Sequence, residues 1–410
     1  MTRFFHRVEH TVATLGLAMA MLACGAAPDH GSTGDDGGAL DGGSGGGSGS
    51  GSDGSGSMPG LGLHTSEGQI YDSNGDVVRL TGVNWFGLET TDFKPHGLWM
   101  RTLDQLLDSV ATAGFNTIRL PYCNTALTSS SNSALDTNMN PDLVGKTGLE
   151  IMDKVVAGAG ARGIKVILDR HTLHGEPNTN VTLWYDSQVS EQQWIADWVM
   201  LAQHYQGNPT VIGFDLQNEP HGTARWGNGD PATDWQLAAQ KAGDAILAVN
   251  SDLLIIVEGV EQYDNQFYWW GGQLMGAATH PVTLAVPNKL IYSPHDYPAS
   301  LFNQTWFTDP TYPANLPAEW DANWGYLAKG RTAPIVIGEF GSRLQTTSDM
   351  QWMSALAHYI STNALSFTYW ALNPDSGDTG GILGDDWTTI DQTKMAILTP
   401  ILAPKLPANN

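Results

Sequence analysis

Short apolar runs alternate with longer amphipathic stretches along most of the chain after about residue 60. Most of these runs are continuously apolar instead of alternating, a pattern typical of parallel strands that are covered on both faces. We therefore expect eight strands, at 78–87, 116–122, 165–171, 211–220, 253–260, 289–297, 335–341 and 366–373.

The stretches between the runs carry apolar residues at helical spacing. Clear examples lie at 102–114, 149–163, 190–205 and 234–250, and the first two end in Gly, a common helix stop. Eight strand–helix repeats predict an α/β protein folded as a single (β/α)8 barrel. The segment 64–78, before the first repeat, predicts a small hairpin that covers the barrel floor.

The first 58 residues predict export and tethering. Arg3 and Arg7 precede an apolar run at 11–23, which is shorter than the ~20 residues that span a bilayer. Residues 1–24 are therefore predicted to be a lipoprotein-type signal peptide with Cys24 lipidated; a plain secretory signal is the alternative. Residues 25–58 are rich in Gly, Ser and Asp and predict a flexible linker. A globular body would then occupy 59–410, at the cell envelope or secreted.

Charge excludes some classes of partner. Lys and Arg number 19 against 42 Asp and Glu, a net charge of −23, which disfavours nucleic acid and electrostatic docking on anionic lipid. Membrane contact is expected only through the N-terminal anchor. Two cysteines rule out a disulfide framework, and Cys123 is predicted to be a free buried thiol. We expect a monomer that needs no cofactor and no metal.

Polar residues gather where the predicted strands end. The active site of such a barrel is built at the C-terminal ends of its strands. Polar groups there need partners or form a site. In chain order these residues are Arg119, Asp169, Arg170, His171, Asn218, Glu219, Glu258, His295, Asp296, Tyr297, Glu339, Trp370 and Asn373.

Two of these residues, Glu219 and Glu339, form the central pair of the hypothesis. Two carboxylates across a cleft are the minimum for glycoside hydrolysis, because one protonates the leaving oxygen while the other attacks or activates water. Their pKa values must be held apart. We expect Arg119 to keep one of them ionised and Tyr297 to hydrogen-bond the same group. Asn218 is placed to hold the sugar 2-hydroxyl.

Structural explanations remain open for several of these side chains. Arg119 has Asp169 as an alternative partner, and Asp169 and Arg170 are candidates to pair with each other. Glu258 is expected to support the site instead of reacting. His171 and His295 have the alternative of being hydrogen-bonded core histidines. A zinc site is disfavoured because no third ligand stands at metal spacing and no HExxH sequence occurs.

The fifteen Trp residues require a large core or an aromatic-lined cleft. Flat sugar faces stack on aromatic rings, so Trp near strand ends predict subsite platforms, whereas Trp within helical patterns predict core. The predicted platforms are Trp99, Trp270 and Trp370; the predicted core residues are Trp194, Trp198 and Trp235. A Trp-rich, acidic cleft suits a long neutral polysaccharide better than an anionic one.

Six short sequences stand in barrel order: GFNTIRLPY, ILDRH, VIGFDLQNEPHG, YSPHDY, IGEFG and YWALNPDSGDTGGIL. They resemble family 5 of the glycoside hydrolases, above all its bacterial endo-β-1,4-glucanases typified by those of actinobacteria. The resemblance runs from about 63 to 403 and makes 59–410 the catalytic domain. It implies a (β/α)8 barrel and a retaining mechanism through a covalent glycosyl-enzyme intermediate, with Glu219 as acid/base and Glu339 as nucleophile.

The resemblance also assigns the supporting residues. The remaining active-site positions of the family match Arg119, His171, Asn218, His295, Tyr297 and Trp370, and two aromatic subsite positions match Trp99 and Trp270. The implied substrate is cellulose or a related β-glucan. Two alternatives stay open: the same chemistry on mannan, xyloglucan or mixed-linkage glucan, and a non-catalytic surface lipoprotein that only binds glycans.

Overall fold

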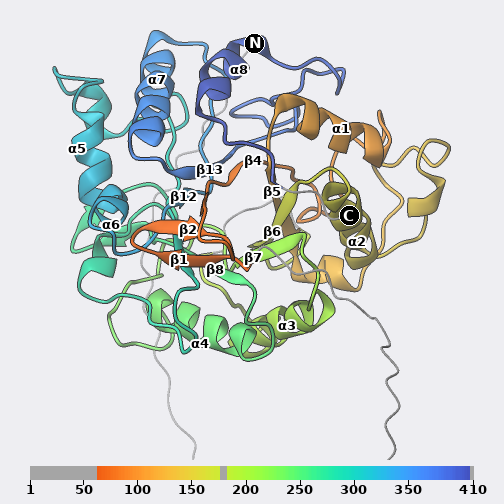
Figure 1. The fold of residues 1–410 in the computed structure, drawn as a ribbon, viewed down its shortest axis with the longest axis horizontal. Coiled ribbons are helices and arrows are strands. Elements are labelled where there is room, and N and C mark those ends of the chain that lie inside the picture. The colour runs from red at the N-terminus through yellow and green to blue at the C-terminus, as the bar shows by residue number, and fades with distance from the viewer. Residues whose placement is uncertain (1–61, 176–181, 407–410) are drawn as a thin grey trace, which may run out of the picture. The chain divides into compact units, whose positions relative to one another are not determined.

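The computed structural model describes residues 62–175 and 182–406. The predicted signal peptide, Cys24 and the predicted linker lie outside these residues. Within them, eight parallel strands form one sheet in the order β11-β8-β7-β6-β5-β4-β13-β12. A parallel bridge between Tyr292 and Ile335 joins the two edges of this sheet, so that the strands nearly close a barrel (Figure 1). The predicted parallel α/β architecture is confirmed at this level.

Each predicted apolar run contains or overlaps one barrel strand. The strands are β4 Thr81–Asn84, β5 Thr117–Cys123, β6 Lys165–Thr172, β7 Val211–Asp215, β8 Leu254–Glu258, β11 Leu290–Ser293, β12 Val336–Ile337 and β13 Ser366–Tyr369. Several strands end before their run does. The run 211–220 leaves the sheet after Asp215, and its last residues form the loop that carries Asn218 and Glu219.

The four helices named from the sequence are present within a few residues of their expected bounds: α1 Leu103–Ala113, α2 Gly148–Gly160, α3 Glu191–His204 and α4 Trp235–Leu247. Helix α1 begins at a capping box between Thr102 and Gln105, which satisfies two free backbone N–H groups. It ends at Gly114, whose φ of 90° favours glycine.

The later connections are less regular. Between β8 and β11, the place of a helix is taken by a hairpin, β9 Gln262–Tyr263 and β10 Gln266–Phe267, and a 3₁₀ turn at Met275–Ala278. The expectation of a helix in every repeat is therefore wrong at this connection. The remaining α-helices are α5 Leu316–Trp320, α6 Tyr326–Lys329, α7 Thr347–Thr362 and α8 Gln392–Leu398. A π turn at Asp321–Gly325 links α5 to α6. Further 3₁₀ turns lie at Asn124–Leu127, Pro141–Leu143, Thr305–Thr308 and Thr399–Ile401.

A small antiparallel sheet closes one end of the barrel. It consists of β1 His64–Ser66, β2 Gln69–Tyr71 and β3 Val77–Val78, so the predicted hairpin has a third strand. Ile70 and Val78 pack in one apolar cluster with barrel residues such as Ile167 and Leu254. In Figure 1 this sheet lies in front of the barrel strands. The carboxyl ends of the strands are left open on the other side.

Core tryptophans fix the ends of two strands. Trp194, Trp198 and Trp235 are completely buried, as predicted. The indole N–H groups of Trp194 and Trp198 both donate to the carbonyl of Leu216, at 3.0 and 3.1 Å, and that of Trp235 donates to the carbonyl of Glu258 at 2.8 Å. These bonds anchor the backbone where β7 and β8 deliver side chains to the open end.

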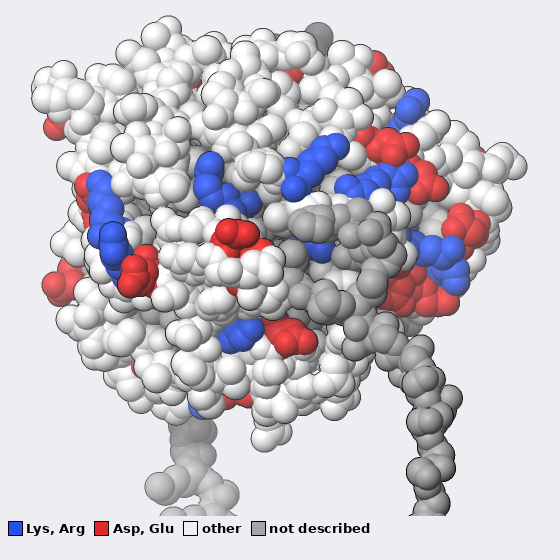
Figure 2. Space-filling model, viewed as in Figure 1, with Lys and Arg blue, Asp and Glu red and all other residues white. Residues whose placement is uncertain are grey.

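The surface carries scattered charge on the side that the floor sheet occupies. Figure 2 shows acidic and basic side chains interspersed there, with wide areas that carry neither. Across the ranges 62–175 and 182–406, helices long and apolar enough to cross a membrane are absent. Cys123 is buried and free, as predicted, and burial raises the pKa of its thiol to about 12.

Candidate active site

A cavity of about 470 Å³ opens at the carboxyl ends of the barrel strands. Its walls include predicted site residues from several strand ends: His171, Asn218, Glu219, Tyr297, Glu339 and Trp370, joined by Trp270 from the loop after β8. Residues separated by up to about 200 positions in the sequence therefore meet in one place, as the barrel hypothesis requires.

Glu219 and Glu339 face each other across this cavity. One carboxylate oxygen of each lies within 4.8 Å of the other. Glycosidases that retain configuration hold their two carboxyl groups at about 5–5.5 Å, and those that invert hold them at about 6.5–9.5 Å. The separation therefore fits direct attack by one carboxylate on the sugar and falls short of the spacing typical of inverting enzymes.

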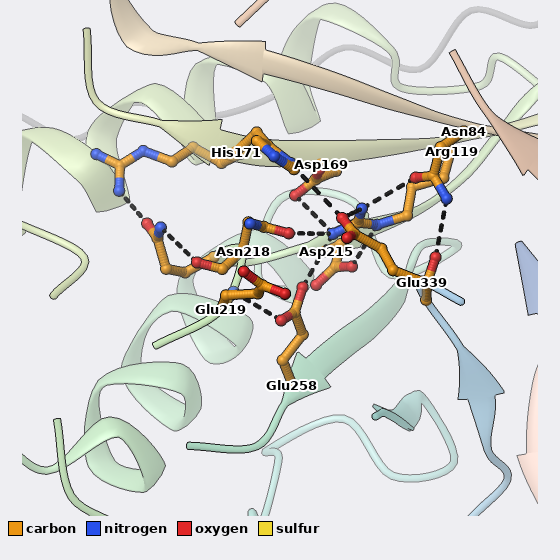
Figure 3. Close-up of polar contacts among 12 residues, drawn as sticks. Asn84, Arg119, Asp169, His171, Asp215, Asn218, Glu219, Glu258 and Glu339 are labelled. Atoms are coloured by element: carbon orange, nitrogen blue, oxygen red, sulfur yellow. Dashed lines mark hydrogen bonds and ion pairs between the residues drawn. The ribbon is translucent and has the colours of Figure 1, made fainter. Parts of the chain in front are cut away.

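Arg119 lies at the centre of the polar network below the cavity (Figure 3). Its buried guanidinium donates to Glu339 Oε1 at 2.7 Å, as expected from the sequence. It also contacts the carboxylates of Asp169, Asp215 and Glu258 and the side-chain oxygens of Asn84 and Asn218. Both partners that the sequence suggested for Arg119, Asp169 and Glu339, are thus present together.

These contacts give Glu339 a distinct ionisation state. Burial by itself raises the pKa of a carboxyl group, but the positive charges of His295, Arg119 and His171 outweigh it. The hydroxyl of Tyr297 adds a hydrogen bond to Oε2 at 2.6 Å. Together they lower the pKa of Glu339 to about 2. The side chain is therefore ionised throughout the neutral and mildly acidic range.

The two histidines contact the two acids differently. His171 lines the cavity and pairs through Nδ1 with Asp169 at 2.7 Å. Burial lowers the pKa of His171, but Asp169, Glu339 and Glu89 together outweigh burial and raise it to about 9. His295 is buried below the cavity, with Nδ1 2.9 Å from Glu219 Oε1 and Nε2 3.3 Å from Glu258 Oε1. Against burial, the charges of Glu258 and Glu339 hold the pKa of His295 well above its usual range.

The sequence has no third ligand at metal spacing from these histidines, but the fold brings carboxylates from other strands close to both of them. Asp169, His171 and Glu339 place ligand atoms within 4.8 Å of one another, and so do Glu219, His295 and Glu339. Arg119 and the two histidines supply the positive charge that these carboxylates require. The expectation that the protein needs no metal stays a prediction.

Other polar strand ends turn out to be structural. Asp169 and Arg170 do not pair with each other: Asp169 contacts Arg119 and His171, whereas Arg170 donates to Asn124 at 2.7 Å and to the carbonyl of Trp184 at 3.0 Å. Successive residues of a strand point to opposite faces, which separates the two side chains.

Asp296 and Asn373 also serve the scaffold. Buried Asp296 accepts hydrogen bonds from Trp352 at 2.6 Å, from Trp320 at 3.1 Å and from the hydroxyl of Tyr268. Burial raises the pKa of its carboxyl to about 7. Asn373 holds the backbone of Phe86 through both its amide atoms. These contacts fix the aromatic walls and the loop after β4.

The predicted aromatic platforms divide into two groups. Trp370 lines the cavity and stacks on His171, with ring centroids 5.3 Å apart, and Trp270 lines it and stacks on His221 at 3.8 Å. Trp99 does not line this cavity. Its half-buried ring packs edge-on against His96 and Trp387.

Several cavity residues were missed by the sequence analysis. They stand in the loops after β8, β11 and β13: Glu261, Tyr268, Trp269, Leu301, Phe302, Gln304 and Asp378. Phe302 has 64% of its surface exposed at the rim. The aromatic run at 268–270, placed directly after a strand end, was the one signal that pointed to this wall.

Known proteins share this chain's sequence and fold. A family model described as cellulase (glycosyl hydrolase family 5) matches residues 71–376. An endoglucanase of Paenibacillus polymyxa is 52% identical over 347 residues, which cover 83% of this chain and 87% of the relative. The major extracellular endoglucanase of Xanthomonas campestris is 42% identical over 338 residues, covering 80% of this chain and 69% of the relative.

Solved structures agree with these sequence matches. The catalytic domain of the Xanthomonas campestris enzyme superposes with a TM-score of 0.78 at 40% identity, covering 83% of this chain and 99% of that one. An endocellulase from Pyrococcus horikoshii, solved in complex with cellotetraose, has a TM-score of 0.78 at 38% identity and covers 84% of this chain and 99% of that one.

Proposed function

The chain belongs to glycosyl hydrolase family 5, and we propose that it is a retaining endo-β-1,4-glucanase that cleaves internal bonds of cellulose or related β-glucans. The observation that carries the proposal is the pair of facing carboxylates, within 4.8 Å of each other and in different surroundings. Glu339 is enclosed by positive charge, whereas Glu219 is half-buried at the cavity wall and has His295 as its side-chain partner.

In the first step, ionised Glu339 attacks the anomeric carbon and Glu219 gives its proton to the departing glycosidic oxygen. The C–O bond to the leaving sugar breaks as the bond to the Glu339 oxygen forms. Arg119 and Tyr297 each hold one oxygen of Glu339, which aims the carboxylate before the substrate arrives. Asn218 lines the cavity beside this pair, where it can hold the 2-hydroxyl of the reacting sugar.

In the second step, Glu219 takes a proton from water, and the resulting hydroxide attacks the anomeric carbon and releases Glu339. The same residue serves as acid and then as base, because the first step leaves it deprotonated. Two inversions at one carbon retain its configuration. The roles of both acids, and of Arg119, His171, Asn218, His295, Tyr297 and Trp370 around them, are part of the proposal.

The cavity walls support a neutral sugar polymer as substrate. Trp270 and Trp370 offer stacking faces, while Glu261 and Asp378 add acidic groups at the walls. The relatives described above are named endoglucanases, and one of them is solved with cellotetraose. Mannan, xyloglucan and mixed-linkage glucan need the same chemistry, and the loops that line the cavity decide among them.

Export belongs to the proposal as well. Residues 1–24 would act as a lipoprotein-type signal with lipidation at Cys24, 25–58 as a linker and 59–410 as a monomeric catalytic domain. The basic and apolar segments that end in a small-residue box before Cys24 support this. One relative is named as an extracellular enzyme. Metabolic labelling with a fatty acid, compared between wild type and Cys24→Ser, tests the anchor.

The activity is tested on carboxymethylcellulose by measuring reducing-sugar release and loss of viscosity, with mannan and xylan as further substrates. The wild type should lower viscosity quickly, and Glu339→Gln should not. Activity confined to mannan would keep the mechanism and overturn the substrate. Absence of activity on every polysaccharide, in a wild type that circular dichroism shows to be folded, would favour a protein that only binds glycans.

A further inference from the structure

Glu258, the last residue of β8, touches the supports of both acids without reaching the cavity. Its side chain is completely buried. Oε2 accepts the backbone N–H of Glu219 at 2.7 Å, and Oε1 accepts from Arg119 Nη2 at 2.9 Å and lies 3.3 Å from His295 Nε2. Figure 3 shows the carboxylate directed toward Glu219 and Arg119 from its own strand.

The hydrogen bond between Glu258 and the Glu219 N–H holds a residue with an unusual backbone conformation. Glu219 has a φ of 47°, in the left-handed region that residues with a side chain rarely adopt. Such a conformation persists only where the surroundings over-determine it. The carboxylate of Glu258 is one of those surroundings, because it accepts the N–H of this same residue. It also reaches His295, whose other ring nitrogen contacts the Glu219 side chain.

Glu258 is itself held in place from the far side. Gly271 packs against it so closely that a Cβ at this position would stand 2.3 Å from Oε2. The strand end, the loop at Gly271, Arg119 and His295 therefore leave the carboxylate one position. In that position it fixes Glu219 twice, through the backbone N–H and through His295.

The nucleophile depends on Glu258 much less. Both oxygens of Glu339 have their own donors, Arg119 and Tyr297. The guanidinium of Arg119 is held by Asp215 at Nε, 2.9 Å away, and by Asn84 as well as by Glu258. Loss of one contact therefore leaves Arg119 anchored, whereas Glu219 would lose its backbone acceptor and the partner of its histidine.

We propose that Glu258 is a positioning residue for the proton donor Glu219, and that it acts mainly on the step in which the leaving oxygen is protonated. The inference rests on the proposed retaining mechanism. General acid catalysis contributes about 10²–10⁴-fold where a leaving group requires a proton. Misplacing Glu219 should therefore lower the rate of bond cleavage only slightly when the leaving group departs as a stable anion. It should lower that rate strongly when the leaving group is a sugar.

The test compares kcat/KM for two substrates that differ in this requirement. 2,4-Dinitrophenyl β-cellobioside releases a stabilised phenolate without protonation, whereas cellotetraose releases a sugar alkoxide that must be protonated. Glu258→Gln should lower kcat/KM on cellotetraose by about 10²-fold or more, which is the size of a loss of acid catalysis. The loss of kcat/KM on the aryl glycoside should be at least ten times smaller. The ratio of the two values is independent of the fraction of folded enzyme.

Two further variants make the readout specific. Asp215→Asn removes a different carboxylate from Arg119 and should lower both values by similar factors. Glu258→Asp keeps the charge but shortens the reach to the Glu219 N–H, so it should reproduce the selective loss. Equal losses on both substrates in the Glu258 variants would overturn the positioning role. A wild type inactive on both substrates would instead overturn the proposed function.

Discussion

Glu219 and Glu339 are the same residue type at equivalent strand ends, and their neighbours make them different. Glu339 has a donor for each oxygen and three positive charges nearby, which favour its ionised form. Glu219 is half-buried at the wall and meets His295. At the scale of single residues, contacts that come from other strands thus distinguish the two carboxylates, and the proposed roles of nucleophile and acid/base rest on this difference.

The first prediction concerns the acidic limb of the pH profile. Glu339 is active when ionised, so activity falls as pH drops through its pKa. Because that pKa is lowered to about 2, the acidic limb of kcat/KM should lie below the value of ~4.3 that is usual for a free glutamate. The profile is measured on cellotetraose, with Trp fluorescence recorded at each pH to confirm that the protein is folded. A limb at or above the free-glutamate value in folded enzyme would contradict the environment described for Glu339.

The second prediction removes one donor from the nucleophile. Tyr297→Phe deletes the 2.6 Å hydrogen bond to Glu339 Oε2. A hydrogen bond to a charged group contributes about 1.5–3 kcal/mol, so kcat/KM should fall roughly 10- to 100-fold. With less stabilisation of its ionised form, Glu339 should have a higher pKa, and the acidic limb should move to higher pH.

The control for this experiment is Tyr205→Phe, which deletes a hydroxyl bonded to Asp153 at 2.8 Å, outside the cavity. Its kcat/KM and its pH profile should match those of the wild type. An acidic limb that stays in place in Tyr297→Phe would show that the phenol does not stabilise the ionised form of Glu339.

At the scale of elements, the sequence predicted the strands well because parallel strands buried on both faces need long apolar runs, and their polar ends stand out. It also predicted which strand ends meet. The error at Asp169 and Arg170 came from treating neighbours in sequence as neighbours in space. Alternation along β6 sends the first toward Arg119 inside the barrel and the second toward Asn124 and Trp184.

The loops were harder to predict because their direction depends on packing between distant segments. Trp99 stands in the loop after β4 and packs against His96 and Trp387, and it is not among the residues that line the described cavity. Phe302 and Asp378 reach the cavity from loops that carry no periodic pattern. The connection between β8 and β11, residues 259–289, is long enough for a helix, yet it forms the hairpin β9–β10 and a 3₁₀ turn.

The third prediction concerns the floor sheet, whose contribution should be to stability and not to catalysis. Ile70 on β2 is 2% exposed and packs among the starts of the barrel strands. Ile70→Ala removes buried methyl groups and should cost about 2–5 kcal/mol of unfolding free energy. Urea unfolding measures this, and kcat/KM at a temperature where the variant is folded should stay within twofold of the wild type.

Val77→Ala on the neighbouring strand β3 is the matched control, because Val77 is 52% exposed. It should change the free energy of unfolding by no more than about 0.5 kcal/mol. A similar cost for both variants would mean that the floor cluster does not carry the stability attributed to it. A large loss of kcat/KM in folded Ile70→Ala would couple the floor to the active site.

At the scale of the whole molecule, the barrel separates stability from chemistry by placing them at opposite ends. The floor sheet closes one end with apolar packing, and the strand ends at the other gather the charged groups. The whole chain carries 42 acidic against 19 basic residues. Among the described residues that line the cavity, carboxylates occur at Glu219, Glu261, Glu339 and Asp378, whereas Lys and Arg are absent. A polymer that carries negative charge therefore meets repulsion both at long range and at the cavity wall.

This imbalance leads to the last prediction, on the choice between neutral and anionic glucans. The wild type should have a higher kcat/KM on neutral mixed-linkage glucan than on highly substituted carboxymethylcellulose. Asp378 is exposed at the cavity wall, and Asp378→Asn removes its charge while keeping an oxygen to accept from Ser376 and from the Thr379 N–H. Because exposed charge pairs are worth about 0.2–1 kcal/mol, this variant should raise relative activity on the carboxymethylated polymer by about 1.4- to fivefold.

Varying the ionic strength shows whether the effect of Asp378→Asn comes from the lost charge or from a changed shape of the cavity wall. Repulsion acts over about 30 Å at 0.01 M salt and about 3 Å at 1 M, so the gain in Asp378→Asn should be present at low salt and lost at high salt. Glu67→Gln removes the same charge from the turn between β1 and β2 and should leave the ratio unchanged. An equal gain in Glu67→Gln would assign the discrimination to net charge. A gain in Asp378→Asn that persists at high salt would assign it to the shape of the wall, because screening removes long-range repulsion but leaves steric contacts as they are.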